Sequence, residues 1–103
     1  MANQTALKKA RQLKSVLQKN GWPIQKVWLF GSQAKGTATT ASDIDVAVLT
    51  LPFANTKHRE NTEFMWACRD IDLKIETICL HPEDLENKYH VIAQEALEHG
   101  IEV

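Results

Sequence analysis

The sequence predicts a single domain, residues 1–103, of the α/β or α+β class, with helices packed on a mixed sheet of at least three strands. Segments with the apolar spacing of a helix alternate with short runs of β-branched and aromatic residues. Hydrophobic residues make up 44% of the chain and charged residues 24%, ordinary values that exclude a disordered or coiled-coil protein. No apolar run approaches the roughly 18 residues that span a bilayer.

The first part of the chain predicts a helix, a strand and a loop. Apolar residues recur at helical spacing in residues 5–20, which predicts an amphipathic helix that ends before Gly21. Residues 24–30 are apolar on both faces of an extended chain, which is typical of a central strand. Residues 31–42 are rich in Gly, Ser, Thr and Ala and predict a loop, with one helical turn near 33–35.

The remaining elements alternate between strand and helix. In chain order they are a strand at 44–51, a helix at 56–69, a strand at 72–80, a short turn of helix from Pro82, a helix at 91–99 and an extended tail at 101–103. Phe64, Ala67 and Cys68 are expected on the buried side of the helix at 56–69. Trp28 and Trp66 are expected in the core, and the four histidines (His58, His81, His90 and His99) at the surface or at helix caps.

Cysteine usage and the amino-terminal segment predict a cytoplasmic protein. Cys68 and Cys79 form neither a disulfide framework nor a spacing typical of zinc ligands, and we expect both to be small buried hydrophobic residues. Residues 1–18 mix basic, polar and apolar types and lack the apolar centre of a secretory signal.

Charge is distributed unevenly along the chain. Residues 1–42 carry seven Lys or Arg and no Asp or Glu, whereas residues 43–103 carry five basic and thirteen acidic residues. The basic part either attracts an anionic ligand or is a solvated helix face balanced within the molecule. The overall pI of about 6.4 argues against a dedicated nucleic-acid-binding protein.

A glycine-led turn follows the strand at 24–30. Gly31 allows the backbone to turn sharply and a ligand to approach closely. Ser32 then offers backbone N–H groups and a hydroxyl, which are suitable donors for phosphate oxygens.

Two carboxylates lie at the start of the next strand. Asp43 and Asp45 are two residues apart, so both side chains project from the same face, while Ile44 and Val46 project from the other. Paired carboxylates repel each other unless a cation lies between them. Hard oxygen ligands beside a phosphate site suit Mg²⁺, which predicts metal-assisted chemistry on a phosphate ester.

These residues resemble a known signature. Gly31-Ser32, Gly36 and the run Ser42-Asp43-Ile44-Asp45 are similar to the motif of the nucleotidyltransferase superfamily with the DNA polymerase β-like fold, and in particular to its minimal members. The resemblance implies transfer of a nucleoside monophosphate, AMP from ATP, to a hydroxyl of a protein or small molecule. It also implies that Gly31 and Ser32 bind the triphosphate and that Asp43 and Asp45 hold two Mg²⁺ ions. Lys35 and Ser42 are further candidates for binding the nucleotide.

The resemblance requires a third carboxylate on a neighbouring strand. Asp70, Asp72 and Glu76 share one parity, so strand alternation does not choose among them. Glu76 is preferred because it lies in the middle of the predicted strand, and Asp72 is the alternative ligand. The family's usual residue is Asp, and the extra methylene of Glu shifts the ligand oxygen.

The resemblance also implies a partner. Minimal members pair with a small helical protein of the HEPN type in toxin–antitoxin modules, and a homodimer is the other source of an acceptor pocket. A second hypothesis is a binding module without strong catalysis that neutralises its partner by contact. A third is a nucleotide or RNA-end binder that uses the basic part of the chain.

Overall fold

The computed structural model describes residues 2–39 and 42–103, so residues 40 and 41 of the predicted loop lie outside it. Nine elements follow one another in the described chain. They are α1 (Gln4–Lys19), β1 (Ile24–Phe30), α2 (Gly31–Lys35), β2 (Ile44–Thr50), α3 (Lys57–Cys68), β3 (Ile75–Leu80), α4 (Pro82–Glu86), α5 (Val91–His99) and β4 (Ile101–Glu102). The predicted α/β class is confirmed, and the helix predicted at 91–99 matches α5.

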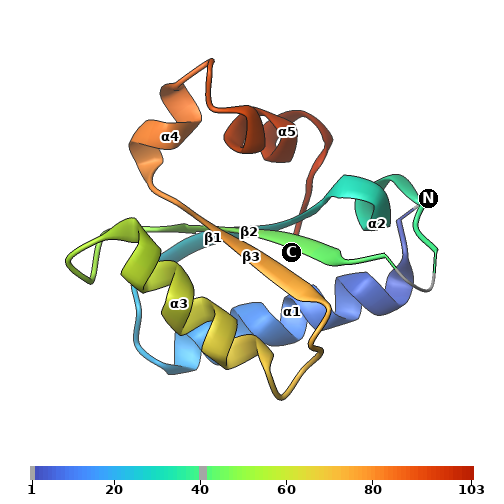
Figure 1. Ribbon diagram of the computed structural model, residues 1–103, viewed down its shortest axis with the longest axis horizontal. Coiled ribbons are helices and arrows are strands. Elements are labelled where there is room, and N and C mark those ends of the chain that lie inside the picture. Colours follow the sequence, from blue (N-terminus) through green and yellow to red (C-terminus); the bar gives the residue numbers. More distant parts are fainter. Residues whose placement is uncertain (1, 40–41) are drawn as a thin grey trace.

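The four strands form one mixed sheet in the order β3-β2-β1-β4. β1 pairs antiparallel with both β2 and β4, whereas β2 and β3 run parallel. A parallel pair needs a crossover connection, and α3 supplies it between β2 and β3. Figure 1 shows the sheet between two layers, with α1 and α3 on one side and α4 and α5 on the other.

Each face of the sheet has its own core. Leu13 and Leu17 of α1 and Phe64 of α3 pack on one face, against inward residues of β1 and β2 such as Val27 and Val46. The smaller core on the other face joins β-strand residues to Ala93 and Ala96 of α5. Burial on both faces explains why β1 and β2 are apolar almost throughout.

The third strand begins later than the sequence predicts. Residues 69–74 form a turn in which the N–H groups of Ile71 and Asp72 both donate to the Cys68 carbonyl, and β3 starts only at Ile75. Asp72 also accepts a hydrogen bond from the Lys74 N–H at 2.8 Å. A side chain that bonds its own backbone two residues on favours a turn over a strand, which accounts for the difference.

One side-chain placement expected from the sequence is wrong, and one helix-cap residue is more buried than most. Trp66 is 59% exposed on the outer side of α3, where its ring stacks under the Arg69 guanidinium at 4.8 Å. His81 is the N-cap residue of α4, a position consistent with the expectation, and its side chain is buried. Cys68 and Cys79 are buried free thiols, as predicted. Among the described residues, no helix is long and apolar enough to cross a bilayer.

Candidate active site

Strand register brings two of the predicted carboxylates side by side. Asp45 of β2 pairs with Phe30 of β1 on one side and with Glu76 of β3 on the other. Residues opposite each other in a sheet project from the same face, so Asp45 and Glu76 lie next to each other. Phe30 packs in the core beneath α5, which identifies this face as the one that α4 and α5 partly cover. Asp45 is half-buried and Glu76 is exposed.

Asp43 adds a second negative charge beside Asp45. The pKa of Asp45 is raised above its ordinary value, first because burial disfavours the charged form and then because Asp43 repels it. Asp43 itself is exposed just before β2. The site therefore concentrates negative charge where it is costly, which favours occupation by a cation.

Gly31 brings the start of α2 against the Asp45 carboxylate. Its φ of +71° lies in the left-handed region, and a β-carbon at this position would overlap the Asp45 Oδ2 atom. Such a β-carbon would also lie 3.4 Å from Cγ and 3.5 Å from Cβ of the same side chain. Only glycine therefore allows the predicted phosphate-binding backbone and the predicted metal ligand to be in contact.

Gly31→Ala should reduce both stability and nucleotidyl transfer. Left-handed strain costs roughly 1–2 kcal/mol for a residue with a β-carbon, and overlap with Asp45 adds to it. Gly21→Ala is the matched control, because Gly21 has a φ of +80° and open space around it, so that variant suffers the strain alone. Urea unfolding and a transfer assay measure the two effects. Equal stability and equal activity of the two variants would contradict the close packing of Gly31 on Asp45.

The other predicted nucleotide-binding residues have partners within the chain. Lys35 Nζ lies 3.0 Å from Glu95 Oε1 of α5, and both side chains are partly exposed. Ser42 Oγ accepts a hydrogen bond from the Thr39 N–H at 2.9 Å, and the Ser42 carbonyl accepts one from Gln33 Nε2 at 3.4 Å. Ser42 is therefore held by contacts to Thr39 and to Gln33 of α2.

Asp72, the alternative third carboxylate, is directed toward α1. It accepts a hydrogen bond from Lys9 of α1, the helix that packs on the opposite face of the sheet from Phe30. Its pKa is lowered by the hydrogen bonds from Lys9 and from the Lys74 N–H. Asp72 and Glu76 are both even-numbered and would share a face in a continuous strand. Asp72 lies in the turn before β3, however, so strand alternation does not extend to it.

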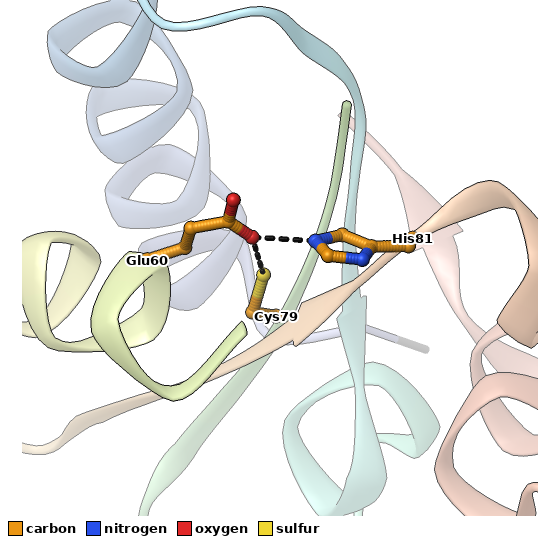
Figure 2. A group of neighbouring side chains, drawn as sticks. All are labelled: Glu60, Cys79 and His81. Atoms are coloured by element: carbon orange, nitrogen blue, oxygen red, sulfur yellow. Dashed lines mark hydrogen bonds and ion pairs between the residues drawn. The ribbon is translucent and has the colours of Figure 1, made fainter. Parts of the chain in front are cut away.

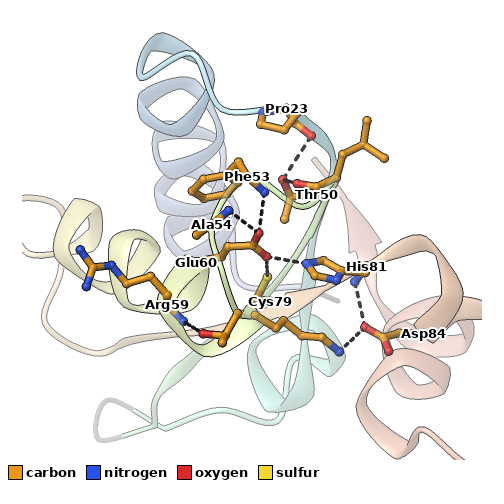
Figure 3. A network of polar contacts seen from close by, with 12 residues as sticks. Pro23, Thr50, Phe53, Ala54, Arg59, Glu60, Cys79, His81 and Asp84 are labelled. Atoms are coloured by element: carbon orange, nitrogen blue, oxygen red, sulfur yellow. Dashed lines mark hydrogen bonds and ion pairs between the residues drawn. The ribbon is translucent and has the colours of Figure 1, made fainter.

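A buried polar network was missed by sequence reasoning. Glu60 of α3 has no exposed surface, and its carboxylate accepts hydrogen bonds from the N–H groups of Phe53 (2.6 Å) and Ala54 (3.0 Å). The other carboxylate oxygen lies 2.5 Å from His81 Nε2 and 3.6 Å from Cys79 Sγ. Figure 3 shows these contacts joining α3, the segment before it and the end of β3.

Two signals in the sequence point to this network. Glu60 lies four residues before Phe64 and eight before Cys68, so it shares their buried helix face. Cys79 and His81 are two residues apart at the end of a strand and project from the same face. Helical and strand periodicity together therefore place all three side chains in the space between α3 and β3.

Comparison with known proteins assigns the fold. The family model described as polymerase beta, nucleotidyltransferase matches residues 11–102. No curated protein matches the chain. A chain in a toxin–antitoxin crystal structure with AMP-PNP superposes with a TM-score of 0.64 at 24% identity, over 90% of this chain and 70% of that one.

Two further solved structures share the fold. One is a chain of the complex between the tri-AMPylated HEPN toxin of Shewanella oneidensis and its MNT antitoxin (TM-score 0.59, 20% identity, 94% of this chain and 70% of that one). The other is a putative nucleotidyltransferase from Sulfolobus solfataricus (TM-score 0.56, 18% identity, 97% and 86%). The family model covers nearly the whole chain, and the sheet carries acidic residues beside a glycine-led turn. The chain therefore belongs to the polymerase β-type nucleotidyltransferase family.

Proposed function

We propose that the protein is a metal-dependent enzyme that transfers AMP from ATP to a hydroxyl group of a HEPN-type partner protein. One observation carries this proposal. Asp45 and Glu76 are in register on adjacent strands, with Asp43 close enough to raise the Asp45 pKa and Gly31 packed on the Asp45 carboxylate. The glycine-led turn and the carboxylates thus meet where β1 ends and β2 and β3 begin, which supports the proposal.

The residues at this edge fit a hard divalent cation. They offer carboxylate oxygens, which Mg²⁺ prefers, and their mutual repulsion is relieved by positive charge. The space that a β-carbon at residue 31 would fill is kept open beside Asp45 Oδ2. Asp43, Asp45 and Glu76 would hold the ions, two in the proposed mechanism. Bound Mg²⁺ would neutralise triphosphate charge and lower the pKa of the acceptor hydroxyl.

The chain's own residues would position the reactants. The backbone of Gly31 and Ser32 would bind the triphosphate, and Lys35 and Ser42 are candidates for further contacts to the nucleotide. The acceptor oxygen would form a bond to the α-phosphorus while the bond to the bridging oxygen of the β-phosphate breaks. Pyrophosphate leaves with that bonding pair, and the hydroxyl proton passes to solvent. Catalysis of this kind depends mainly on alignment and charge neutralisation.

Two of the structural relatives support a protein acceptor. One relative was solved with AMP-PNP, and another belongs to a complex whose HEPN toxin is AMPylated. A contact-only binding module is the second candidate function, because the exposed Glu76 stands where the family's usual third carboxylate is Asp.

A transfer assay with labelled ATP distinguishes the two candidate functions. The protein is incubated with Mg²⁺, α-labelled ATP and the product of the neighbouring gene as the proposed partner. Transfer predicts label on the partner, whereas a contact-only module predicts a stable complex and no label with or without metal. Chelation of Mg²⁺ should remove the label but leave the complex intact.

The third carboxylate is tested by a pair of substitutions. Glu76→Gln should lower transfer by about 10²-fold or more, because the side chain in register with Asp45 loses its charge. Asp72→Asn removes the same charge from a residue bonded to Lys9 and should leave the transfer rate within about twofold. Transfer rates of the two variants are measured at saturating ATP. The reverse pattern would assign the ligand role to Asp72.

A further inference from the structure

A cluster of side chains that could ligate a metal lies on the opposite face of the sheet from the carboxylates of the active site. Glu60, Cys79 and His81 each offer one donor atom, and these atoms all lie within 4.8 Å of one another. Figure 2 shows Cys79 and His81 both directed to one carboxylate oxygen of Glu60. Cys79 packs in the core between the sheet and α1 and α3, the opposite face from Phe30. Cys79 lies near the carboxyl end of β3 and His81 directly follows it, whereas Glu76 lies near its start.

We propose that Glu60, Cys79 and His81 form a zinc-binding site. Thiolate, imidazole and carboxylate are the three ligand types that proteins use for Zn²⁺, and a sulfur ligand disfavours Mg²⁺ or Ca²⁺. All three side chains are buried, so the charge of the site must balance. A carboxylate and a thiolate together balance one Zn²⁺ ion.

One donor separation matches a tetrahedral site, and a second would need a small adjustment. Bonds of about 2.0–2.3 Å to zinc place neighbouring donors about 3.3–3.5 Å apart. Cys79 Sγ and Glu60 Oε1 are 3.6 Å apart, which already matches. His81 Nε2 is 2.5 Å from the same oxygen, so its ring must withdraw by slightly less than 1 Å. A small rotation of the imidazole supplies that movement.

Surrounding groups hold the ligands in place. Glu60 Oε2 is fixed by the N–H groups of Phe53 and Ala54, which leaves Oε1 directed to the cluster. His81 Nδ1, the ring nitrogen not directed to Glu60, lies 3.7 Å from the exposed carboxylate of Glu83. The His81 N–H donates to Asp84 at 2.8 Å, and Lys57 donates to the same oxygen at 2.7 Å.

A pocket of about 200 Å³ borders the cluster. It is lined by Cys79 together with Lys57, His58, Asn61 and Ile78. In the proposed site the ion enters from this pocket, and water from it completes the coordination as a fourth ligand. Burial raises the pKa of the Cys79 thiol to about 12, so binding releases the thiol proton to solvent as the Zn–S bond forms.

Cobalt provides the test, because a thiolate bound to Co²⁺ gives a charge-transfer band in the near ultraviolet that carboxylate ligands do not give. Chelator-treated protein is titrated with Co²⁺ in excess Mg²⁺, which occupies the carboxylates at Asp45. We expect one equivalent of Co²⁺ to produce the band and Zn²⁺ to abolish it by displacement. Absence of the band in the wild-type protein would overturn the proposal.

The two buried cysteines supply a matched pair. Cys79→Ser should lose the band and bind Zn²⁺ at least about 100-fold more weakly, whereas Cys68→Ser should keep both. Zn²⁺ should raise the Tm of wild type and Cys68→Ser but not of Cys79→Ser. His81→Gln serves as a second ligand variant if Cys79→Ser fails to fold by circular dichroism. A band of equal strength in the ligand variants would show that the cluster is a hydrogen-bond network without a metal.

Discussion

Asp45→Asn should lower nucleotidyl transfer by at least about 10³-fold while making the metal-free protein more resistant to heat. The activity falls because Asp45 is the central carboxylate, between Asp43 and Glu76, in the proposed binding of metal and triphosphate. A factor of 10³ corresponds to about 4 kcal/mol of transition-state stabilisation. Stability rises because the pKa of Asp45 is raised: its ionised form is disfavoured in the folded protein, and the amide removes that charge.

The opposite directions of the two effects make this experiment decisive. Tm is measured in chelator, and transfer is measured with Mg²⁺ and the partner protein. Asp70→Asn is the charge-matched control, because Asp70 lies exposed in the turn before β3 and should change neither quantity. A fall in activity accompanied by lower stability would assign the Asp45→Asn loss to unfolding, and full activity would refute the assigned role.

Glu60→Ala should lower the free energy of unfolding by about 3–5 kcal/mol. The carboxylate is fully buried and is the acceptor for two backbone N–H groups and the His81 ring. Its removal leaves these donors without a partner and opens a cavity between α3 and β3. Glu63→Ala on the same helix removes only a partly exposed pair with Arg59 at 3.8 Å and should cost less than about 0.5 kcal/mol.

The pH dependence of the free energy of unfolding provides a second test of the role of Glu60. Burial favours the neutral carboxyl, but hydrogen bonds from His81, Phe53 and Ala54 outweigh it, and the pKa lies below the ordinary 4.5. A lowered pKa contributes stability that is complete above pH 4.5 and is lost as the pH falls through the folded-state value. Urea unfolding of chelator-treated protein should therefore show the gap between wild type and Glu60→Ala narrowing below that pH. A gap that widens on acidification would show that Glu60 is neutral when folded.

Local patterns predicted most of the fold because each element has a clear apolar period. The double-faced apolar run of β1 and the capped helix α5 matched their predicted bounds. The start of β3 was missed because Asp72 and Lys74 read as alternating strand residues, yet their hydrogen bond closes a turn. Trp66 was misplaced because residue type favours burial, while its position on α3 faces outward.

The candidate site was predictable only where it is local in sequence. Gly31, Asp43 and Asp45 lie within one short segment, so turn and strand geometry sufficed to propose them. Glu76 reaches Asp45 through the register of a parallel strand pair, which no local pattern specifies. The contact of Lys9 with Asp72 likewise joins residues that are 63 positions apart. Both facts depend on how the sheet and its helices assemble.

The crossover between β2 and β3 also limits which changes of length the chain tolerates. An inserted residue that the turn at 69–74 does not absorb would advance β3 by about 3.3 Å against its neighbour and reverse the direction of every side chain in it. Glu76 would then project toward α1 and α3, and Ile75 would take its place beside Asp45. Substitutions in this turn are therefore expected to be mild, whereas insertions and deletions there should be inactivating.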